Sequence, residues 1–210
     1  MLGLMQDHPL LISSIFEHAV GNYGKQEIVS NTVEGGIHRY NYSSWGERTK
    51  KLANALKSLN LNQGDKVGTL AWNGYRHLEI YYATSCSGLI CHTLNPRLHP
   101  DQVSYIVNHA EDKVLCVDLN ILPLIEKASE NFKTVEALVI MTDEKNMIKP
   151  NIKDGIKVIC YEEFIKDQLE EYIWPQLDEK TASSLCYTSG TTGNPKGVLY
   201  SHRSTVLHAY

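Results

Sequence analysis

Residues 187–198 read YTSGTTGNPKGV, a run of glycines, hydroxyls and one lysine that follows an apolar segment. Its glycines, Gly190, Gly193 and Gly197, allow positive φ and close approach of the backbone to a ligand. Successive N–H groups in such a turn form a concave anion site, to which Ser and Thr hydroxyls add donors. Lys196 at the rim supplies a compact positive charge suited to a phosphate oxygen. The stretch therefore predicts a loop that holds a polyphosphate.

The spacing argues against the P-loop of nucleoside triphosphatases. That motif has four residues between its glycines and ends in Gly-Lys-Ser/Thr. Here two residues separate Gly190 from Gly193, and Lys196 lies between Pro195 and Gly197. The alternative that the protein is a generic nucleotide-binding domain such as an NTPase is also disfavoured, because no recognisable metal-binding aspartate follows a predicted strand. The structural alternative, a surface turn with one solvated lysine, is disfavoured by the length of the run.

The same stretch resembles the phosphate-loop signature of the AMP-binding, adenylate-forming enzymes, which include acyl-CoA synthetases, luciferases and peptide-synthetase adenylation domains. Two further segments resemble the medium- to long-chain fatty acyl-CoA synthetase branch, which also includes methylmercaptopropionate–CoA ligases. They are residues 92–118, HTLNPRLHPDQVSYIVNHAEDKVLCVD, and residues 200–210, YSHRSTVLHAY. The resemblance extends over essentially all 210 residues.

The resemblance implies an ATP-dependent acid–thiol ligase of fatty acid metabolism. Such an enzyme converts a fatty acid to an acyl-adenylate, releases pyrophosphate and then forms the thioester with coenzyme A. ATP, Mg²⁺ and coenzyme A are the cofactors and cosubstrates it implies. One alternative keeps the mechanism and changes the acid, for example to methylmercaptopropionate. An alternative of another class is a non-catalytic fragment that serves in dimerisation or binding.

The resemblance also implies roles for individual residues. Thr188 and Lys196 are the implied catalytic residues, with the Thr188 hydroxyl beside the metal. His208 would line the acyl tunnel near the carboxylate, and His202 with Arg203 would brace the loop. Acid/base catalysis by the two histidines is disfavoured because no carboxylate partner is near in sequence. The implied nucleotide-binding set is Thr188, Ser189, Gly190, Thr191, Thr192, Gly193 and Lys196.

Strand-like and helix-like segments alternate from Lys66 onward, which predicts parallel βαβ units in an α/β fold: a layered parallel β-sheet with helices on both faces. A helix from Pro9, a hairpin and a helix capped by Ser43 or Ser44, with Glu47 in a capping box, are expected before it. The hairpin strands are expected at 27–31 and 37–41. The sheet strands are expected at 66–71, 89–93, 113–118, 135–141, 156–160, 181–187 and 197–201. The helices between them are expected at 73–86, from 100, at 121–131, at 162–169 and from 202, with a surface loop at 142–155.

No helix cap or polar tail marks an end at Tyr210. Residues 1–210 are therefore expected to be the N-terminal portion of an AMP-binding large domain. The rest of that domain and the small C-terminal domain, with the adenine and ribose sites, would follow. On this view the 210-residue chain alone is incomplete and inactive. The resemblance further implies a homodimer through the segment 1–20, including Leu10, Leu11 and Ile15.

The composition is that of an ordinary soluble globular protein, with 42% hydrophobic and 21% charged residues and a net charge of −4. Nucleic acid and anionic membranes are not expected partners, and no stretch approaches the roughly 20 apolar residues of a membrane span. Five cysteines without a CxxC pair indicate neither zinc nor disulfides and favour the cytoplasm. A polar cluster fits a turn before a helix better than a metal site; its members are His92, Asn95, Arg97, His99 and His109.

Overall fold

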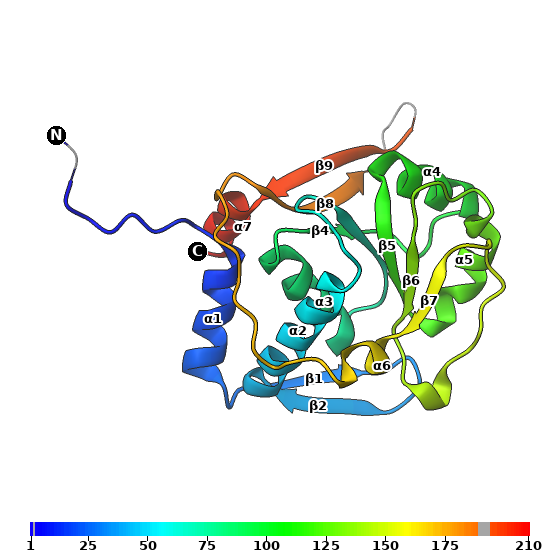
Figure 1. The fold of residues 1–210 in the computed structure, drawn as a ribbon, viewed down its shortest axis with the longest axis horizontal. Helices are drawn as coiled ribbons and strands as arrows, with labels where there is room; N and C mark the ends of the chain where they lie inside the picture. The colour runs from blue at the N-terminus through cyan, green and yellow to red at the C-terminus, as the bar shows by residue number, and fades with distance from the viewer. Residues whose placement is uncertain (2, 189–193) are drawn as a thin grey trace.

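A seven-stranded sheet in the order β7-β6-β5-β3-β4-β8-β9 forms the centre of the molecule (Figure 1). The computed structural model describes residues 1, 3–188 and 194–210. The strands of this sheet are β3 (Lys66–Leu70), β4 (Ile90–Thr93), β5 (Asp112–Val117), β6 (Ala137–Ile140), β7 (Lys157–Cys160), β8 (Ala182–Thr188) and β9 (Lys196–Ser201). Neighbouring strands from β7 to β8 pair in parallel, and β9 pairs antiparallel with β8. The predicted α/β fold with a layered, mostly parallel sheet is confirmed.

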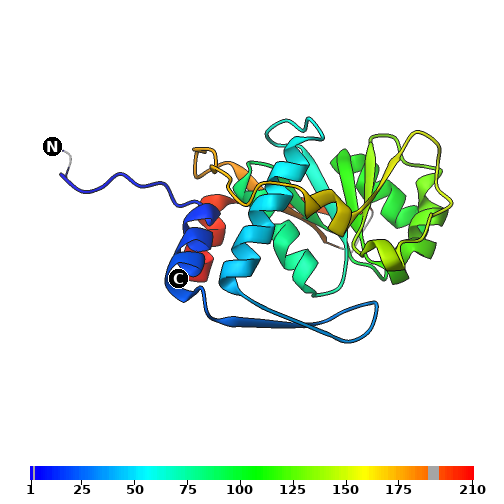
Figure 2. The ribbon, with the colours of Figure 1, turned by 60° about the horizontal axis from the view of Figure 1, so that its bottom comes forward.

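Helices cover both faces of this sheet, as Figures 1 and 2 show. They are α1 (Ile12–Tyr23), α2 (Tyr42–Lys57), α3 (Tyr75–Cys86), α4 (Pro100–Ala110), α5 (Leu122–Ser129), α6 (Tyr161–Lys166) and α7 (His202–Ala209). Short 3-10 turns lie at Leu119–Ile121, before α5, and at Glu144–Asn146, within the predicted surface loop. A separate two-stranded hairpin, β1 (Glu27–Asn31) and β2 (Ile37–Asn41), has the predicted bounds.

The central strands β3 to β6 are buried on both faces, because successive side chains point to opposite sides of the sheet and helices cover both sides. In β5, Val114 and Cys116 belong to the core cluster under α1, α2, α3 and α6. Leu115 and Val117 belong to the cluster under α4 and α5. Such continuous apolar strands, rather than alternating ones, are typical of a parallel sheet between two helix layers.

Several predicted helix bounds were wrong. The helix predicted at 73–86 begins at Tyr75 with Gly74 as its N-cap, and the helix predicted at 162–169 ends at Lys166. The first helix begins at Ile12 rather than Pro9, because Leu11 is extended and serves as its N-cap. The second begins at Tyr42, and its cap is Asn41 rather than a serine. The Asn41 Oδ1 accepts from the Ser44 N–H at 2.9 Å, so Asn41 occupies the capping role earlier in the chain. Trp45, Leu52 and Leu56 of this helix are buried and belong to the hydrophobic core.

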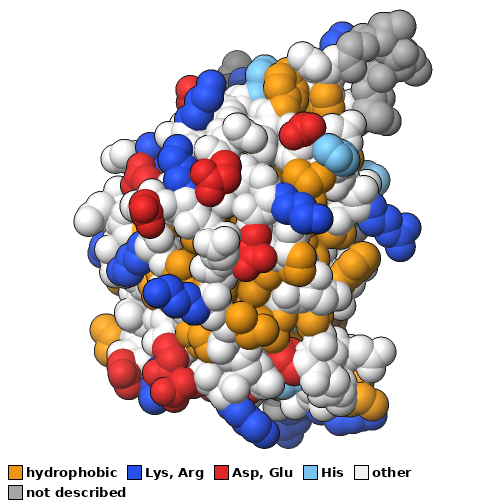
Figure 3. Space-filling view, turned by 90° about the vertical axis from the view of Figure 1, so that its right-hand side faces the viewer, with side chains coloured by type: hydrophobic (Ala, Val, Ile, Leu, Met, Phe, Trp, Pro, Cys, Tyr) orange, Lys and Arg blue, Asp and Glu red, His pale blue; other side chains and the backbone are white. Residues whose placement is uncertain are grey.

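The N-terminal segment extends away from the body before α1, which packs beside α7 (Figures 1 and 2). On the face at the right of Figure 1, acidic and basic side chains are interspersed with apolar ones (Figure 3). Within the described part of the chain, no helix is both long and apolar enough to cross a bilayer.

Candidate functional site

The predicted phosphate loop connects β8 to β9. Thr188, the last residue of β8, is the cross-strand partner of Lys196, the first residue of β9. Both side chains are exposed. The structure therefore brings the two ends of the predicted set opposite one another on neighbouring strands, which places both side chains on the same face of the hairpin. The other members, Ser189, Gly190, Thr191, Thr192 and Gly193, lie outside the described residues.

This hairpin lies at the carboxyl edge of the parallel sheet. The register aligns Thr69 of β3 with Thr93 of β4 and with Cys186 of β8, and Thr188 lies two residues further along β8. In open α/β sheets, ligands bind outside the carboxyl ends of the strands. The position of Thr188 and Lys196 thus fits a ligand-binding edge.

Tyr187 belongs to β8 at the base of the hairpin and contacts both the opposite strand, β9, and helix α4. Its hydroxyl shares a hydrogen bond of 2.6 Å with His109 Nδ1 at the end of α4. A Cβ on Gly197, its cross-strand partner, would lie 3.1 Å from Tyr187 Cζ and 3.1 Å from Leu185 Cδ1. Gly197 was expected to supply backbone freedom; in the structure its lack of a side chain makes room for the Tyr187 ring.

A fully buried pair lies behind Tyr187. His92 Nδ1 contacts both carboxylate oxygens of Asp112 at 2.8 Å, and both side chains are 0% exposed. Burial raises the pKa of Asp112, and the hydrogen bond from His92 acts against that rise. Asp112 Oδ2 would lie 3.1 Å from a Cβ on Gly68, so this glycine leaves room for the carboxylate. The His92 ring centroid is 5.2 Å from that of Tyr187.

The predicted polar cluster of residues 92–109 divides into separate contacts. His99 caps α4, with Nδ1 accepting from the Asp101 N–H at 3.4 Å and a capping box with Gln102. Asn95 Oδ1 accepts from the Arg97 N–H at 2.9 Å in the preceding turn. The expectation that this segment positions the next helix is confirmed. Across residues 1, 3–188 and 194–210, no group of three or more His, Cys, Asp or Glu side chains is placed to hold a metal ion.

The three predicted residues of α7 have different surroundings. His208 is exposed, and its predicted place in an acyl tunnel stays a prediction. His202 is buried, and its Nδ1 accepts from the Ile12 N–H at 3.3 Å. Arg203 donates to Glu179 at 2.6 Å. These bonds fix the start of α7 to α1 and to the turn before β8. His202 and Arg203 were predicted to brace the phosphate loop, but residues 189–193 of that loop lie outside the described residues, so this stays a prediction.

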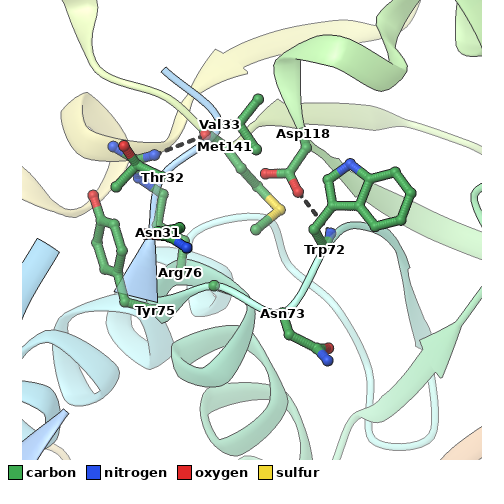
Figure 4. Close-up of a pocket in the computed structure, with 10 residues that line it drawn as sticks. Asn31, Thr32, Val33, Trp72, Asn73, Tyr75, Arg76, Asp118 and Met141 are labelled. Atoms are coloured by element: carbon green, nitrogen blue, oxygen red, sulfur yellow. Dashed lines mark hydrogen bonds between the residues drawn. The ribbon is translucent and has the colours of Figure 1, made fainter. Parts of the chain in front are cut away.

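A small pocket at the carboxyl ends of β3, β5 and β6 was missed by the sequence analysis (Figure 4). The Trp72 N–H donates to Asp118 Oδ2 at 2.7 Å, and Arg76 donates to the Met141 carbonyl at 3.0 Å. Burial raises the pKa of Asp118. The cavity measures about 30 Å³, which is too small for a nucleotide. No local signal in the sequence indicates this pocket, because its lining comes from segments as far apart as Asn31, Trp72 and Met141.

Residues 16–210 match the family of AMP-binding enzymes. The chain belongs to this family. It is 48% identical over 214 residues to the 3-methylmercaptopropionyl-CoA ligase of Ruegeria lacuscaerulensis, covering all of this chain and 38% of the ligase. It is 48% identical over 212 residues to the medium-chain-fatty-acid–CoA ligase of Ectopseudomonas oleovorans, with the same coverage. The long-chain-fatty-acid–CoA ligase of Thermus thermophilus is 42% identical, with 98% of this chain and 36% of the ligase covered.

The fold is also similar to solved ligases. A crystal structure of the anthranilate CoA ligase AuaEII in complex with anthranoyl-AMP superposes with a TM-score of 0.79 at 25% identity, covering 95% of this chain and 37% of that one. The Mycobacterium tuberculosis fatty acyl CoA synthetase superposes with a TM-score of 0.68 at 18% identity, covering 92% and 35%. The chain thus spans well under half the length of these relatives.

Proposed function

We propose that this chain carries the phosphate-binding part of an acyl-CoA synthetase that activates a fatty acid with ATP and transfers the acyl group to coenzyme A. The observation that carries the proposal is the pairing of Thr188 with Lys196 at the carboxyl edge of the sheet. These residues lie within the stretch that resembles the phosphate-loop signature of the family. Relatives named as medium- and long-chain fatty-acid–CoA ligases, at 48% and 42% identity, support the substrate class.

The chemistry explains why such a site is needed. A carboxylate is a poor electrophile because its leaving group would be an oxide, whereas an acyl-adenylate has a good leaving group. As the α-phosphorus is attacked, negative charge moves onto the departing pyrophosphate. Preorganised donors aimed at that charge lower the barrier. The Lys196 ammonium would donate to the β- and γ-phosphate oxygens, and the Thr188 hydroxyl would lie beside them.

The residues at this edge also fit Mg²⁺. This ion keeps several waters and takes few protein ligands together with substrate phosphate oxygens. The exposed hydroxyl of Thr188 offers one oxygen ligand of the required kind. When bound with the nucleotide, Mg²⁺ neutralises charge on the phosphates.

The position of the chain within a longer enzyme is part of the proposal. Residues 1–210 would form the N-terminal portion of the large domain, since the chain covers 38% of its ligase relatives.

We further propose a cytoplasmic enzyme of lipid metabolism. Of the three residues expected at a dimer interface, Leu11 is only 4% exposed and packs in its own chain, so homodimerisation through the N-terminal segment would use the partly exposed Leu10 and Ile15 with the exposed Leu4 and Met5. Sedimentation of wild type and of a variant lacking residues 1–8 would test this.

The central experiment is ATP–pyrophosphate exchange with fatty acids of graded length. It would be run on the 210-residue chain and on the protein encoded by the complete reading frame. We expect exchange by the complete protein and none by the 210-residue chain. The chain-length profile would identify the acid, and methylmercaptopropionate belongs in the panel because a relative named for it is 48% identical. A folded complete protein without exchange for any acid would overturn the proposal.

A further inference from the structure

Tyr187 links the two arms of the hairpin to the body of the molecule. It directly precedes Thr188, and its cross-strand partner Gly197 directly follows Lys196. Its ring covers the position where a Gly197 Cβ would stand, at 3.1 Å from Cζ. A displacement of this ring therefore moves the strand positions next to Thr188 and Lys196 together.

The position of the Tyr187 ring is restricted from several sides. The buried His92–Asp112 pair lies on one side, with the His92 ring centroid 5.2 Å away. His109 contacts the ring edge-on at a centroid distance of 5.8 Å and is itself stacked on Tyr105 at 5.5 Å. Within the described part of the chain, a hydrogen bond of 2.6 Å between the Tyr187 phenol oxygen and His109 Nδ1 joins the ring to α4.

We propose that His109 is a positioning residue for the phosphate-binding hairpin. Through its hydrogen bond to Tyr187 it fixes the strand ends that present Thr188 and Lys196, and it thereby sets the affinity for ATP. This inference rests on the proposed function, because it takes these two residues as the phosphate contacts. His109 would touch neither ATP nor the acid, so it acts through Tyr187.

Loss of a positioning residue impairs ATP use, whereas loss of a purely structural residue lowers the stability of the fold. His109 is exposed and lies in the last turn of α4, away from the core residues Val103, Ile106 and Val107 of that helix. Its loss should therefore leave the folded state intact. Small misplacement of binding groups nevertheless weakens catalysis strongly, by about 100-fold for a 1 Å error. The expected signature is a defect in ATP use in a protein of near-normal stability.

The test uses four variants of the complete protein in ATP–pyrophosphate exchange. His109→Ala and Tyr187→Phe each remove the same hydrogen bond, and each is expected to raise KM for ATP by about 5- to 30-fold, below the effect of a full 1 Å misplacement. KM for the acid should change less than about 2-fold, and the double variant should be no worse than the poorer single one, as expected for two groups that share one interaction. His109→Asn should restore most of the affinity, because an Asn side chain places a polar atom near the position of Nδ1.

Tyr105→Phe is the matched control. It also removes a phenol oxygen, from a ring stacked on the same imidazole, but leaves the bond between His109 and Tyr187 in place. We expect wild-type KM for ATP in this variant. If His109→Ala does not fold, Tyr187→Phe still tests the bond by removing a single oxygen atom.

The outcomes separate this inference from the proposed function. If the wild-type protein exchanges pyrophosphate but KM for ATP is unchanged in Tyr187→Phe and His109→Ala, the positioning role is wrong. The synthetase proposal is then unaffected. Equal rises in KM for ATP and for the acid, or a loss of stability alone, would also overturn it. Absence of exchange in the wild type would instead refute the proposed function.

Discussion

Lys196 and Thr188 face one another at the base of the predicted phosphate loop, and Lys196 provides the first prediction at the scale of a single residue. A charge-assisted hydrogen bond contributes roughly 1.5–3 kcal/mol, so Lys196→Ala should lower the rate of ATP–pyrophosphate exchange by about 10- to 150-fold. The side chain is exposed, so the melting temperature should stay near that of wild type. Lys196→Arg keeps the charge and should be intermediate, because guanidinium and ammonium groups differ in shape and hydration. Exchange within 2-fold of wild type for Lys196→Ala would contradict the assigned role.

Gly197 provides a second prediction at this scale. A methyl group there would lie 3.1 Å from side-chain atoms of both Leu185 and Tyr187, closer than ordinary contact. Gly197→Ala should therefore lower the free energy of unfolding by about 1–3 kcal/mol, as overpacking does. Gly21→Ala is the control, because Gly21 lies within α1 and has nothing within 4 Å of its added Cβ. That variant should be neutral or more stable by about 0.5–1 kcal/mol, and equal urea midpoints for the two variants would refute the argument.

At the scale of elements, a charged network joins α2, α3 and α6. Arg48 of α2 donates to Glu79 of α3 at 2.8 Å and to Glu162 of α6 at 3.0 Å, and the Glu79 side chain is 0% exposed. The Tyr161 hydroxyl also donates to Glu79, at 2.6 Å. Burial raises the pKa of Glu79 in spite of these bonds. Burial acts to raise the pKa of Glu162 as well, but Arg48 and Arg76 outweigh it and the pKa is lowered.

Breaking this network should be costly because it leaves a buried carboxylate without its partner. Arg48→Met is expected to reduce the free energy of unfolding by about 3–5 kcal/mol, the range for a broken buried pair. Adding Glu79→Gln should recover part of the loss. Arg39→Met is the matched control, since the Arg39–Glu27 pair of β1 and β2 is more than half exposed, at 57% and 54%. Arg39→Met should lower the free energy of unfolding, measured with urea, by less than about 1 kcal/mol. Similar losses for Arg48→Met and Arg39→Met would show that the buried network stabilises the protein no more than an exposed ion pair does.

The elements also show what the sequence could predict. The strands of the β1–β2 hairpin were predicted at the observed bounds, because turn residues and β-forming residues act locally. The start of α2 was misplaced because Asn41 and two serines nearby are all suitable caps, and local pattern does not choose among them. The bond between Arg48 and Glu162 joins residues 114 apart in the chain, and no local signal reports it.

The candidate site likewise contains some features that the local sequence predicts and others that arise only from the fold. The glycines, hydroxyls and lysine of residues 187–198 lie within one short segment, so their composition and spacing indicated the phosphate loop directly. The contact of Tyr187 with His109 joins residues 78 apart and arises only when β8 and α4 pack together. His109 was noticed in the sequence as part of a polar cluster, but its partner comes from the topology of the sheet.

At the scale of the whole molecule, two buried histidines make stability depend on pH. His77 bonds to the Trp72 carbonyl at 3.2 Å and to Thr69 at 3.0 Å, and His202 accepts from the Ile12 N–H. Burial lowers the pKa of both imidazoles below the ordinary value of 6.5. Below about pH 6.5 the unfolded chain therefore binds protons that the folded protein excludes, and stability falls as the pH is lowered towards the folded-state pKa values.

His202→Asn isolates one of these groups. Asn offers an amide oxygen near the position of Nδ1, so it can still accept from the Ile12 N–H, but it does not titrate. A single group contributes up to about 1.4 kcal/mol per pH unit to the slope. We expect the variant to be somewhat less stable than wild type at pH 7.5, because its side chain is smaller, and to lose stability more slowly between pH 6.5 and pH 5. Urea unfolding at half-unit steps measures both slopes, with His18→Asn on the exposed surface of α1 as the control for loss of an imidazole. Parallel slopes for wild type and His202→Asn would mean that His202 is protonated in the folded protein, and the link between α7 and α1 through its Nδ1 would then be wrong.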